Sequence, residues 1–166
     1  GDANAQARLG EMYRDGKGVK QDYAKALELF TKAAEQDEPI AQTSLGSMYY
    51  NGRGVKQDYA KALELYTKAA EQDEPFSQVN LGVMYERGQG VKQDYAKALE
   101  WYGKAAEQNN PFAQENLGVM YEFGNGVKQD GKKAREWYNK AAELGHVGAQ
   151  RRLGMVYLRG ILGAEP

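Results

Sequence analysis

A unit of 36 residues recurs along this chain of 166 residues, and it restricts the possible folds more than any other feature. Residues 37–72 and 73–108 align without gaps and are identical at 26 of 36 positions. A glycine followed three places later by a tyrosine recurs in every unit, and four units carry the motif G-x-G-V-K-Q-D. A fixed period in this range is typical of solenoids, in which stacked units share one continuous core.

The period divides the chain into four whole units and one partial unit, all within a single repeat domain, 1–166. We predict repeats at 1–36, 37–72, 73–108 and 109–144, followed by a partial fifth repeat and tail at 145–166. The fifth unit keeps the run LGMVYLRG but lacks the G-x-G-V loop and any second helical pattern. We therefore expect four helix pairs and one further helix.

Each unit is predicted to form two antiparallel helices. In the first unit, apolar and small residues recur with helical spacing over about Ala3–Arg14 and again over Tyr23–Gln36. Two loop glycines allow positive φ, and Asp22 is placed to cap the second helix. At the unit junctions a Gly, Asn or Asp ends one helix, and a proline such as Pro39 occupies the first turn of the next. The pattern predicts an all-α fold, an α-α superhelix.

Two residues inside the first helix are the same in every unit. Glycine in a helix interior costs up to about 1 kcal/mol relative to alanine. Its recurrence at Gly82 and four equivalent positions therefore predicts a close helix–helix approach that any side chain would block. A glutamine recurs at Gln114 and four equivalent positions. We interpret this glutamine as a hydrogen-bonding group between helices, with a ligand-clamping role as the alternative.

The run A-x-x-LG-x-MY-x-x-G-x-GV-x-x-D-Y-x-KA-x-x-x-Y-x-KAAEQ resembles the Sel-one-like repeat, a relative of the tetratricopeptide repeat, over nearly the whole chain. The resemblance implies a right-handed superhelix with the first helices on its concave side, and a role as an adaptor in protein complexes. It also favours an exported bacterial protein, periplasmic or secreted, although the residues themselves leave the compartment open. Two departures are Gly131, where the pattern has tyrosine, and the absence of the cysteines that link units in some bacterial relatives.

One side of the first helix varies between units while the rest stays fixed, which is the pattern expected of a binding surface on a constant scaffold. These positions recur at three- and four-residue spacing and so share one helix face. Drift on an unconstrained surface is the alternative, but the face retains Ile, Phe, Val and Tyr. The predicted partner-binding residues are Ile40, Thr43, Ser47, Tyr50, Phe76, Val79, Asn80, Val83, Glu86, Phe112, Glu115, Asn116, Val119, Glu122, Arg151, Arg152 and Met155.

No pattern in the sequence indicates catalysis, a cofactor or a metal. His146 is the single histidine, it replaces a helix-capping residue, and there is no cysteine, so nucleophilic triads and metal-ligand spacing lack support. A net charge of −1 argues against nucleic acid as a partner, and no apolar run approaches the roughly 20 residues of a membrane-spanning helix. We expect no enzyme activity and no membrane insertion.

The sequence therefore predicts a scaffold that binds a peptide or a partner helix on the concave face. One alternative is a structural array whose ends stack within a larger complex. Another is a hydrolase acting on cell-wall or β-lactam ligands, which some bacterial relatives have been proposed to bind. The near-identity of the units also fits recent duplication or consensus engineering, in which case there would be no native partner.

The partial fifth unit predicts an apolar end to the array. Leu153, Val156 and Tyr157 lie on the stripe that a second helix would cover, and the tail from Ile161 to Pro166 is mostly apolar. Because a solenoid end needs a polar outer face, we expect a monomer with weak end-to-end association. We also expect a native chain that continues past Pro166.

Overall fold

The structure is a computed structural model that describes residues 1–161, with side chains described up to Leu158. The described residues form nine α-helices and no strand, which confirms the predicted all-α class. Expectations for the Ile161 side chain and for the tail to Pro166 lie outside the described residues. The helices are α1 (Ala3–Asp15), α2 (Tyr23–Ala34), α3 (Pro39–Asn51), α4 (Tyr59–Glu71), α5 (Pro75–Arg87), α6 (Tyr95–Glu107), α7 (Pro111–Phe123), α8 (Gly131–Glu143) and α9 (Val147–Ile161).

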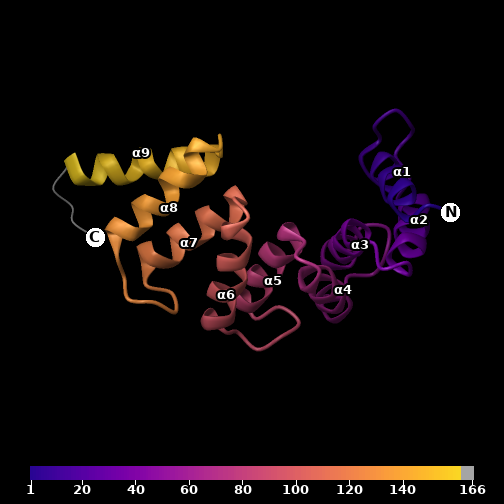
Figure 1. The fold of residues 1–166 in the computed structure, drawn as a ribbon, viewed down its shortest axis with the longest axis horizontal. Helices are drawn as coiled ribbons and strands as arrows, with labels where there is room; N and C mark the ends of the chain where they lie inside the picture. Colours follow the sequence, from indigo (N-terminus) through magenta and orange to yellow (C-terminus); the bar gives the residue numbers. More distant parts are fainter. Residues whose placement is uncertain (162–166) are drawn as a thin grey trace.

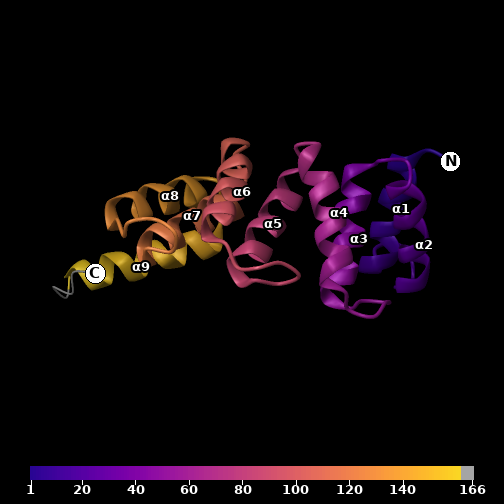
Figure 2. The same ribbon diagram turned by 90° about the horizontal axis from the view of Figure 1, so that it is seen from below.

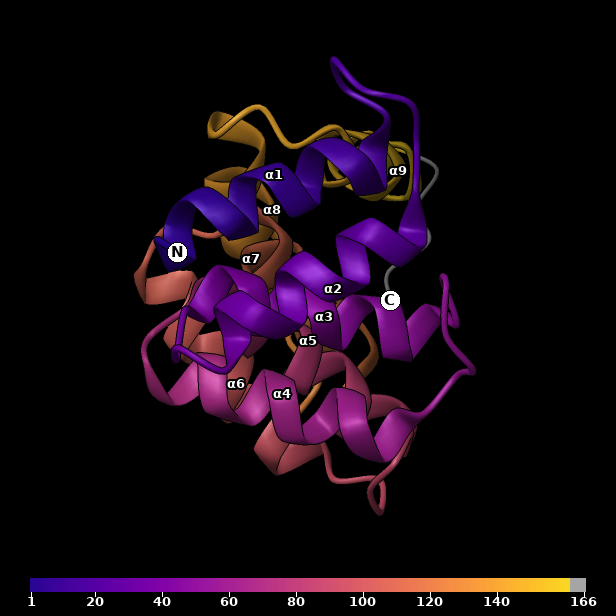
Figure 3. The same ribbon diagram turned by 90° about the vertical axis from the view of Figure 1, so that its right-hand side faces the viewer.

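Successive helix pairs stack side by side into an elongated arc, with α1 at one end and α9 at the other (Figures 1 and 2). A view towards the α1 end shows that the stack also turns, so that later helices appear around and behind α1 and α2 (Figure 3). Each helix contacts mainly the helix before it and the helix after it. The fold is thus a helical superhelix built from neighbour-to-neighbour packing.

The helix boundaries follow from capping residues in the repeated sequence. Asp22, for example, accepts hydrogen bonds from the backbone N–H groups of Ala24 and Lys25, and its copies cap α4, α6 and α8. Asp37 has a φ of 59°, and its equivalents at the next two junctions have nearly the same value. A left-handed residue there lets the chain leave one helix and enter the next within a few residues.

The core runs through the repeat junctions instead of closing within each repeat. One cluster joins Ala26, Phe30 and Ala33 of α2 to Leu45 and Met48 of α3, which belongs to the next repeat. A second cluster joins residues of α5 and α6 to residues of α7 in the same way. Neighbouring repeats are therefore needed to complete each other's core, as expected for a solenoid.

The recurrent helix glycine faces an aromatic ring of the second helix in the same repeat. A Cβ atom added to Gly82 would lie 2.4 Å from Cε1 of Tyr102, and one added to Gly118 would lie 2.4 Å from Cε1 of Tyr138. The same contact occurs in the first two repeats, which confirms the predicted close approach. Gly154 of α9 has no such neighbour within 4 Å among the described residues.

Candidate protein-binding face

The side of the first helices that carries the predicted binding residues, here called the first-helix face, exposes three large apolar side chains. Ile40, Phe76 and Phe112 are 44%, 53% and 48% exposed. The ring centroids of Phe76 and Phe112 are 6.3 Å apart, and the imidazole of His146 lies 4.6 Å from the Phe112 ring in an edge-on arrangement. We call Phe76, Phe112 and His146 the aromatic ladder, because together they span α5, α7 and the start of α9.

Hydroxyl groups connect successive first helices beside this ladder. Thr43 Oγ1 on α3 lies 2.7 Å from Ser77 Oγ on α5 and donates to Glu74 Oε2 at 3.0 Å. Arg14 on α1 donates to Ser44 Oγ on α3 at 3.4 Å. Thr43 is half-buried and Ser44 is buried, so both are partly used in holding repeats together.

Val79 corrects the sequence prediction. Its side chain is 9% exposed and belongs to the core cluster that includes Ala113 and Leu117 of α7. The physical reason is superhelical stacking: the next first helix covers part of the face that a single helix would expose. Val83, one turn further on, also packs against this cluster. We leave Val79 out of the proposed binding surface.

Charged groups gather at the carboxyl-terminal end of the first-helix face. Glu86 accepts a hydrogen bond from the Tyr102 hydroxyl at 2.7 Å, and Glu122 accepts one from the Tyr138 hydroxyl at 2.6 Å. Burial, the first cause, and the adjacent carboxylates both raise the pKa values of Tyr102 and Tyr138. Both phenols therefore stay protonated and act as donors that fix the two carboxylates.

Arg152 of α9 joins this charged end to α7. Its guanidinium donates to Glu115 Oε1 at 3.1 Å and lies 3.6 Å from Glu122 Oε2. His146 Nδ1 lies 3.3 Å from Glu115 Oε2 and also 3.3 Å from the backbone nitrogen of Ala149. A neutral imidazole can accept from Ala149 and cap α9, whereas a protonated one can donate to Glu115. The expected capping role of His146 is therefore present in the structure.

The remaining predicted residues spread over the same face with unequal exposure. Tyr50 donates to Gln89 Oε1 at 2.5 Å and packs edge-on against Tyr59, with ring centroids 5.3 Å apart. On α9, Arg151 and Met155 are exposed. The half-buried members are Ser47, Asn80, Asn116 and Val119. The structure thus brings Phe76, Phe112, Glu115 and Arg152 together, and it places Ile40 and Tyr50 at one margin.

Sequence reasoning missed the second role of Glu74, which was interpreted only as a helix cap. It does accept from the backbone nitrogen of Ser77, but it also accepts from Thr43 of the preceding repeat. No signal in one unit could show this contact, since it depends on the offset between two stacked repeats.

Chemistry other than binding finds no support in the described part of the chain. No group of three or more His, Cys, Asp and Glu side chains among these residues could hold a metal ion. Among the same residues, no helix combines the length and the apolar character that crossing a bilayer requires.

Comparison with known proteins places this solenoid in a family. The model of the Sel1 repeat matches residues 3–38, 39–74, 75–110, 111–146 and 147–166. These units start two residues later than the predicted boundaries, at the proline that begins each first helix. Stacked helix pairs of this kind define an α-helical repeat solenoid. The chain belongs to the Sel1 repeat family, as the sequence resemblance predicted.

Solved structures agree with this assignment. A protective antigen present in uropathogenic Escherichia coli strains is 46% identical, with a TM-score of 0.87 over 96% of this chain and 34% of its own. A Sel1 repeat protein from Oxalobacter formigenes is 39% identical, with a TM-score of 0.89 over 96% of this chain and 65% of its own. An immunity protein from Pseudomonas aeruginosa is 26% identical, with a TM-score of 0.66 over 90% of this chain and 55% of its own.

This chain is therefore shorter than these similar proteins, spanning about a third of the first and just under two thirds of the second. No curated protein gives a significant sequence match. Sel1 repeat proteins are generally protein-interaction scaffolds and generally non-catalytic, and nothing in the comparisons supports the hydrolase alternative.

Proposed function

We propose that this chain is a protein-interaction scaffold that binds an extended peptide segment across the first-helix face, with the aromatic ladder as its apolar centre. The observation that carries the proposal is the exposure of Phe76 and Phe112, each about half exposed on neighbouring repeats. Large apolar side chains gathered on one face of a soluble protein are typical of interaction sites. Aromatic residues are also enriched at the centres of protein interfaces.

The spacing of the ladder favours an extended peptide over a partner helix. The Phe76 and Phe112 ring centroids are 6.3 Å apart. An extended chain rises about 3.3 Å per residue, so side chains two residues apart on one face are separated by about 6.6 Å. Alternate apolar side chains of a peptide that runs along the arc can therefore meet successive rings. A helix offers a less even match, because its neighbouring side chains are three or four residues apart.

The row of first helices also suits a curved binding surface. Thr43 meets Ser77 at 2.7 Å, and Glu115 meets Arg152 at 3.1 Å, so first helices contact one another directly across repeats. In an arc, the elements nearest to one another lie on the inner side. We infer that the ladder faces the concave side, with the Glu86, Glu122 and Arg152 cluster supplying polar contacts beside it.

Selection from a library of random peptides tests this proposal. Peptides selected on the wild-type chain should carry apolar residues at alternate positions, and they should bind the double variant Phe76→Ala/Phe112→Ala at least tenfold more weakly. A tenfold loss corresponds to about 1.4 kcal/mol, which is modest for the removal of two interface aromatic side chains. Titration calorimetry with the selected peptides measures the change.

Phe123 provides the matched control. It is 56% exposed at the end of α7, lies outside the ladder, and is as large as the two ladder residues. Phe123→Ala should leave peptide affinity unchanged, and all variants should melt within a few degrees of the wild type. Equal loss of affinity in Phe123→Ala and the double variant would show general stickiness instead of a site on the first-helix face.

A further inference from the structure

A glutamine pair bridges the two helices of each of the first three repeats. The side-chain amide nitrogen of Gln108, at the end of α6, donates to Gln78 Oε1 on α5 at 3.0 Å. The same bond joins Gln72 to Gln42 at 3.0 Å and Gln36 to Gln6 at 2.9 Å. These bonds confirm the interpretation of the recurrent first-helix glutamine as a hydrogen-bonding group between helices.

The fourth repeat has lost the donor of this pair. Leu144 stands where the first three repeats have glutamine, and its apolar side chain cannot donate to Gln114. Gln114 is only 3% exposed, and its Oε1 atom has no hydrogen-bond partner. A buried polar atom without a partner is costly, and such atoms are rare in native proteins.

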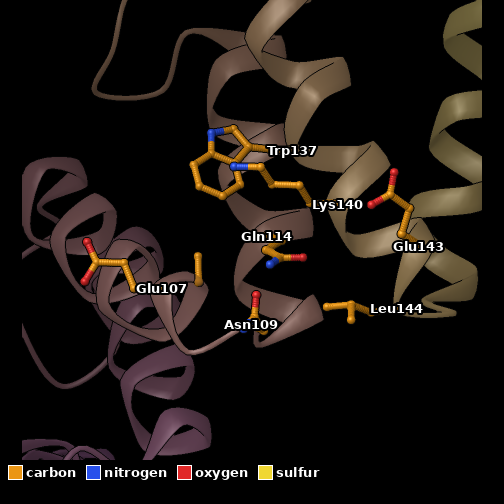
Figure 4. A pocket seen from close by; sticks show the side chains of 8 residues that line it. Glu107, Asn109, Gln114, Trp137, Lys140, Glu143 and Leu144 are labelled. Carbon is orange, nitrogen blue, oxygen red and sulfur yellow. The ribbon is translucent and has the colours of Figure 1, made fainter.

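A pocket of about 400 Å³ lies at this place, between the ends of α6 and α8 and the side of α7. Gln114, Trp137, Lys140, Leu144 and two carboxylates, Glu107 and Glu143, belong to its lining. Figure 4 shows the Gln114 amide among these side chains, with its oxygen directed to the side where Leu144 and Glu143 lie. The Trp137 ring is half-buried, and the Lys140 ammonium lies 4.2 Å from its centroid.

We propose that this pocket, here called the Gln114 pocket, binds a primary carboxamide, specifically the side chain of a glutamine presented by a partner polypeptide. The ligand amide would supply the N–H donor that Leu144 cannot supply. Its methylene groups would lie against Trp137 and Leu144. The fourth repeat would thus take from a partner the group that the other three repeats take from their own sequence.

The first two repeats indicate why an NH₂ group is the best match. Gln36 Nε2 donates both to Gln6 Oε1 and to the backbone carbonyl of Lys32, and Gln72 donates in the same way to Gln42 and to the carbonyl of Lys68. A primary carboxamide has two N–H groups for two such acceptors, whereas a secondary amide has one. A cationic ligand would meet repulsion from the Lys140 ammonium.

This pocket is separate from the first-helix face of the proposed function. Gln114 follows Phe112 by two residues on α7, which places the two side chains about 200° apart around the helix. The Gln114 pocket can therefore be occupied or empty without any change at the aromatic ladder. The two proposals can fail independently.

The two tryptophans of the chain allow a test with an internal control. Trp101 and Trp137 occupy equivalent positions in repeats three and four, beside the closed Gln78–Gln108 pair and the open pocket respectively. The probe is the peptide acetyl-Gly-Gln-Gly-N-methylamide, titrated into the ¹⁵N-labelled chain. We expect a saturable shift of the Trp137 indole N–H resonance in the millimolar range and no shift of the Trp101 resonance. The matched peptides with glutamate or lysine in the central position should not shift either one.

Two variants reverse the pattern. Leu144→Gln should restore the internal pair, abolish the Trp137 response and raise Tm by roughly 2–4 °C. Gln108→Leu should open an equivalent pocket beside Gln78, lower Tm and make Trp101 respond as well. If Gln108→Leu does not fold, the wild type and Leu144→Gln still decide the question.

Three results would overturn the proposal. One is a Trp137 response that persists in Leu144→Gln, and another is an equal or stronger response to the glutamate or lysine peptide. The third is a rise in Tm for Leu144→Gln with no Trp137 response in the wild type, which would mean that Gln114 is satisfied by a water molecule only. None of these results bears on peptide binding at the aromatic ladder.

Discussion

Repeats three and four have nearly the same backbone but differ in how completely their groups are paired. In repeat three, Gln108 bonds Gln78, and Tyr95 at the start of α6 packs against the loop of the next repeat, where a Cβ on Gly126 would lie 2.5 Å from it. In repeat four, Leu144 leaves Gln114 unpaired, and Gly131 replaces the tyrosine. No G-x-G-V loop follows repeat four in the sequence, so a tyrosine at position 131 would lack this packing partner. The residues that depart from the repeat are therefore those whose neighbour is absent.

The helix glycine gives the strongest way to break this comparison. Gly82→Leu should destabilise the chain by about 1–3 kcal/mol, because the new side chain collides with the Tyr102 ring in a packed core. Gly154→Leu should be neutral or slightly stabilising, since nothing lies within 4 Å and leucine is the better helix former. Urea unfolding monitored by circular dichroism measures both. Equal destabilisation by the two substitutions would show that the cost comes from the helix backbone and not from the ring contact.

The exposed side of α9 sharpens the comparison at the level of assembly. Met155, Tyr157 and Leu158 are 43%, 59% and 60% exposed, whereas the corresponding stripes of interior helices are covered by the next helix. We expect a monomer at micromolar concentration and weak association at millimolar concentration, measured by light scattering. Tyr157→Lys/Leu158→Glu should abolish that association without changing Tm by more than a few degrees. A tight dimer at micromolar concentration would contradict the expectation and identify α9 as an interface.

The smallest expected effect is a pH dependence in the first repeat. Arg14 hydrogen-bonds Asp15 and lowers the pKa of that carboxyl from its ordinary 3.8 to about 2. A lowered pKa in the folded state contributes stability above pH ~4 that is lost as the pH falls towards 2. Asp15→Asn should remove a small part of the free energy of unfolding at pH 7, and the difference from the wild type should shrink below pH ~4. The carboxyl ¹³C shift of Asp15, followed by NMR, reports the pKa directly, and a midpoint near 3.8 would contradict the expectation.

Sequence alone predicted the elements and the contacts that repeat with the period. The helices, the caps at Asp22 and its copies, and the glycine–ring approach all follow from residues that recur at fixed offsets. Burial of Val79 could not be predicted, because the next first helix covers it and the offset between helices is not written in one unit. The Glu115–Arg152 contact was equally hidden, since it joins two variable positions 37 residues apart.

One pairing was visible in the sequence only after the structure showed its geometry. Where the second helix carries Tyr102 or Tyr138, the first helix supplies Glu86 or Glu122 as acceptor for the hydroxyl. Where the ring is Phe30, which has no hydroxyl, the first helix has Arg14, and its guanidinium lies 5.9 Å from the ring centroid. The variable face therefore carries two kinds of information, partner contacts and local matches to the ring beneath. Comparing units without a structure cannot separate them.

Packing restricted to neighbours also makes the length of this chain adjustable in whole steps. Deletion of residues 73–108 would remove both members of the Gly82–Tyr102 contact and both members of the Gln78–Gln108 bond, and would leave no half of either behind. The new seam would join Gln72 to Asn109, another residue of the same junction type with a φ of 59°. Thr43 would lose Ser77 but keep its bond to the carbonyl of Pro39 at 2.8 Å. A gene of this kind can thus gain or lose 36 codons by recombination between its own copies and still encode a closed set of contacts.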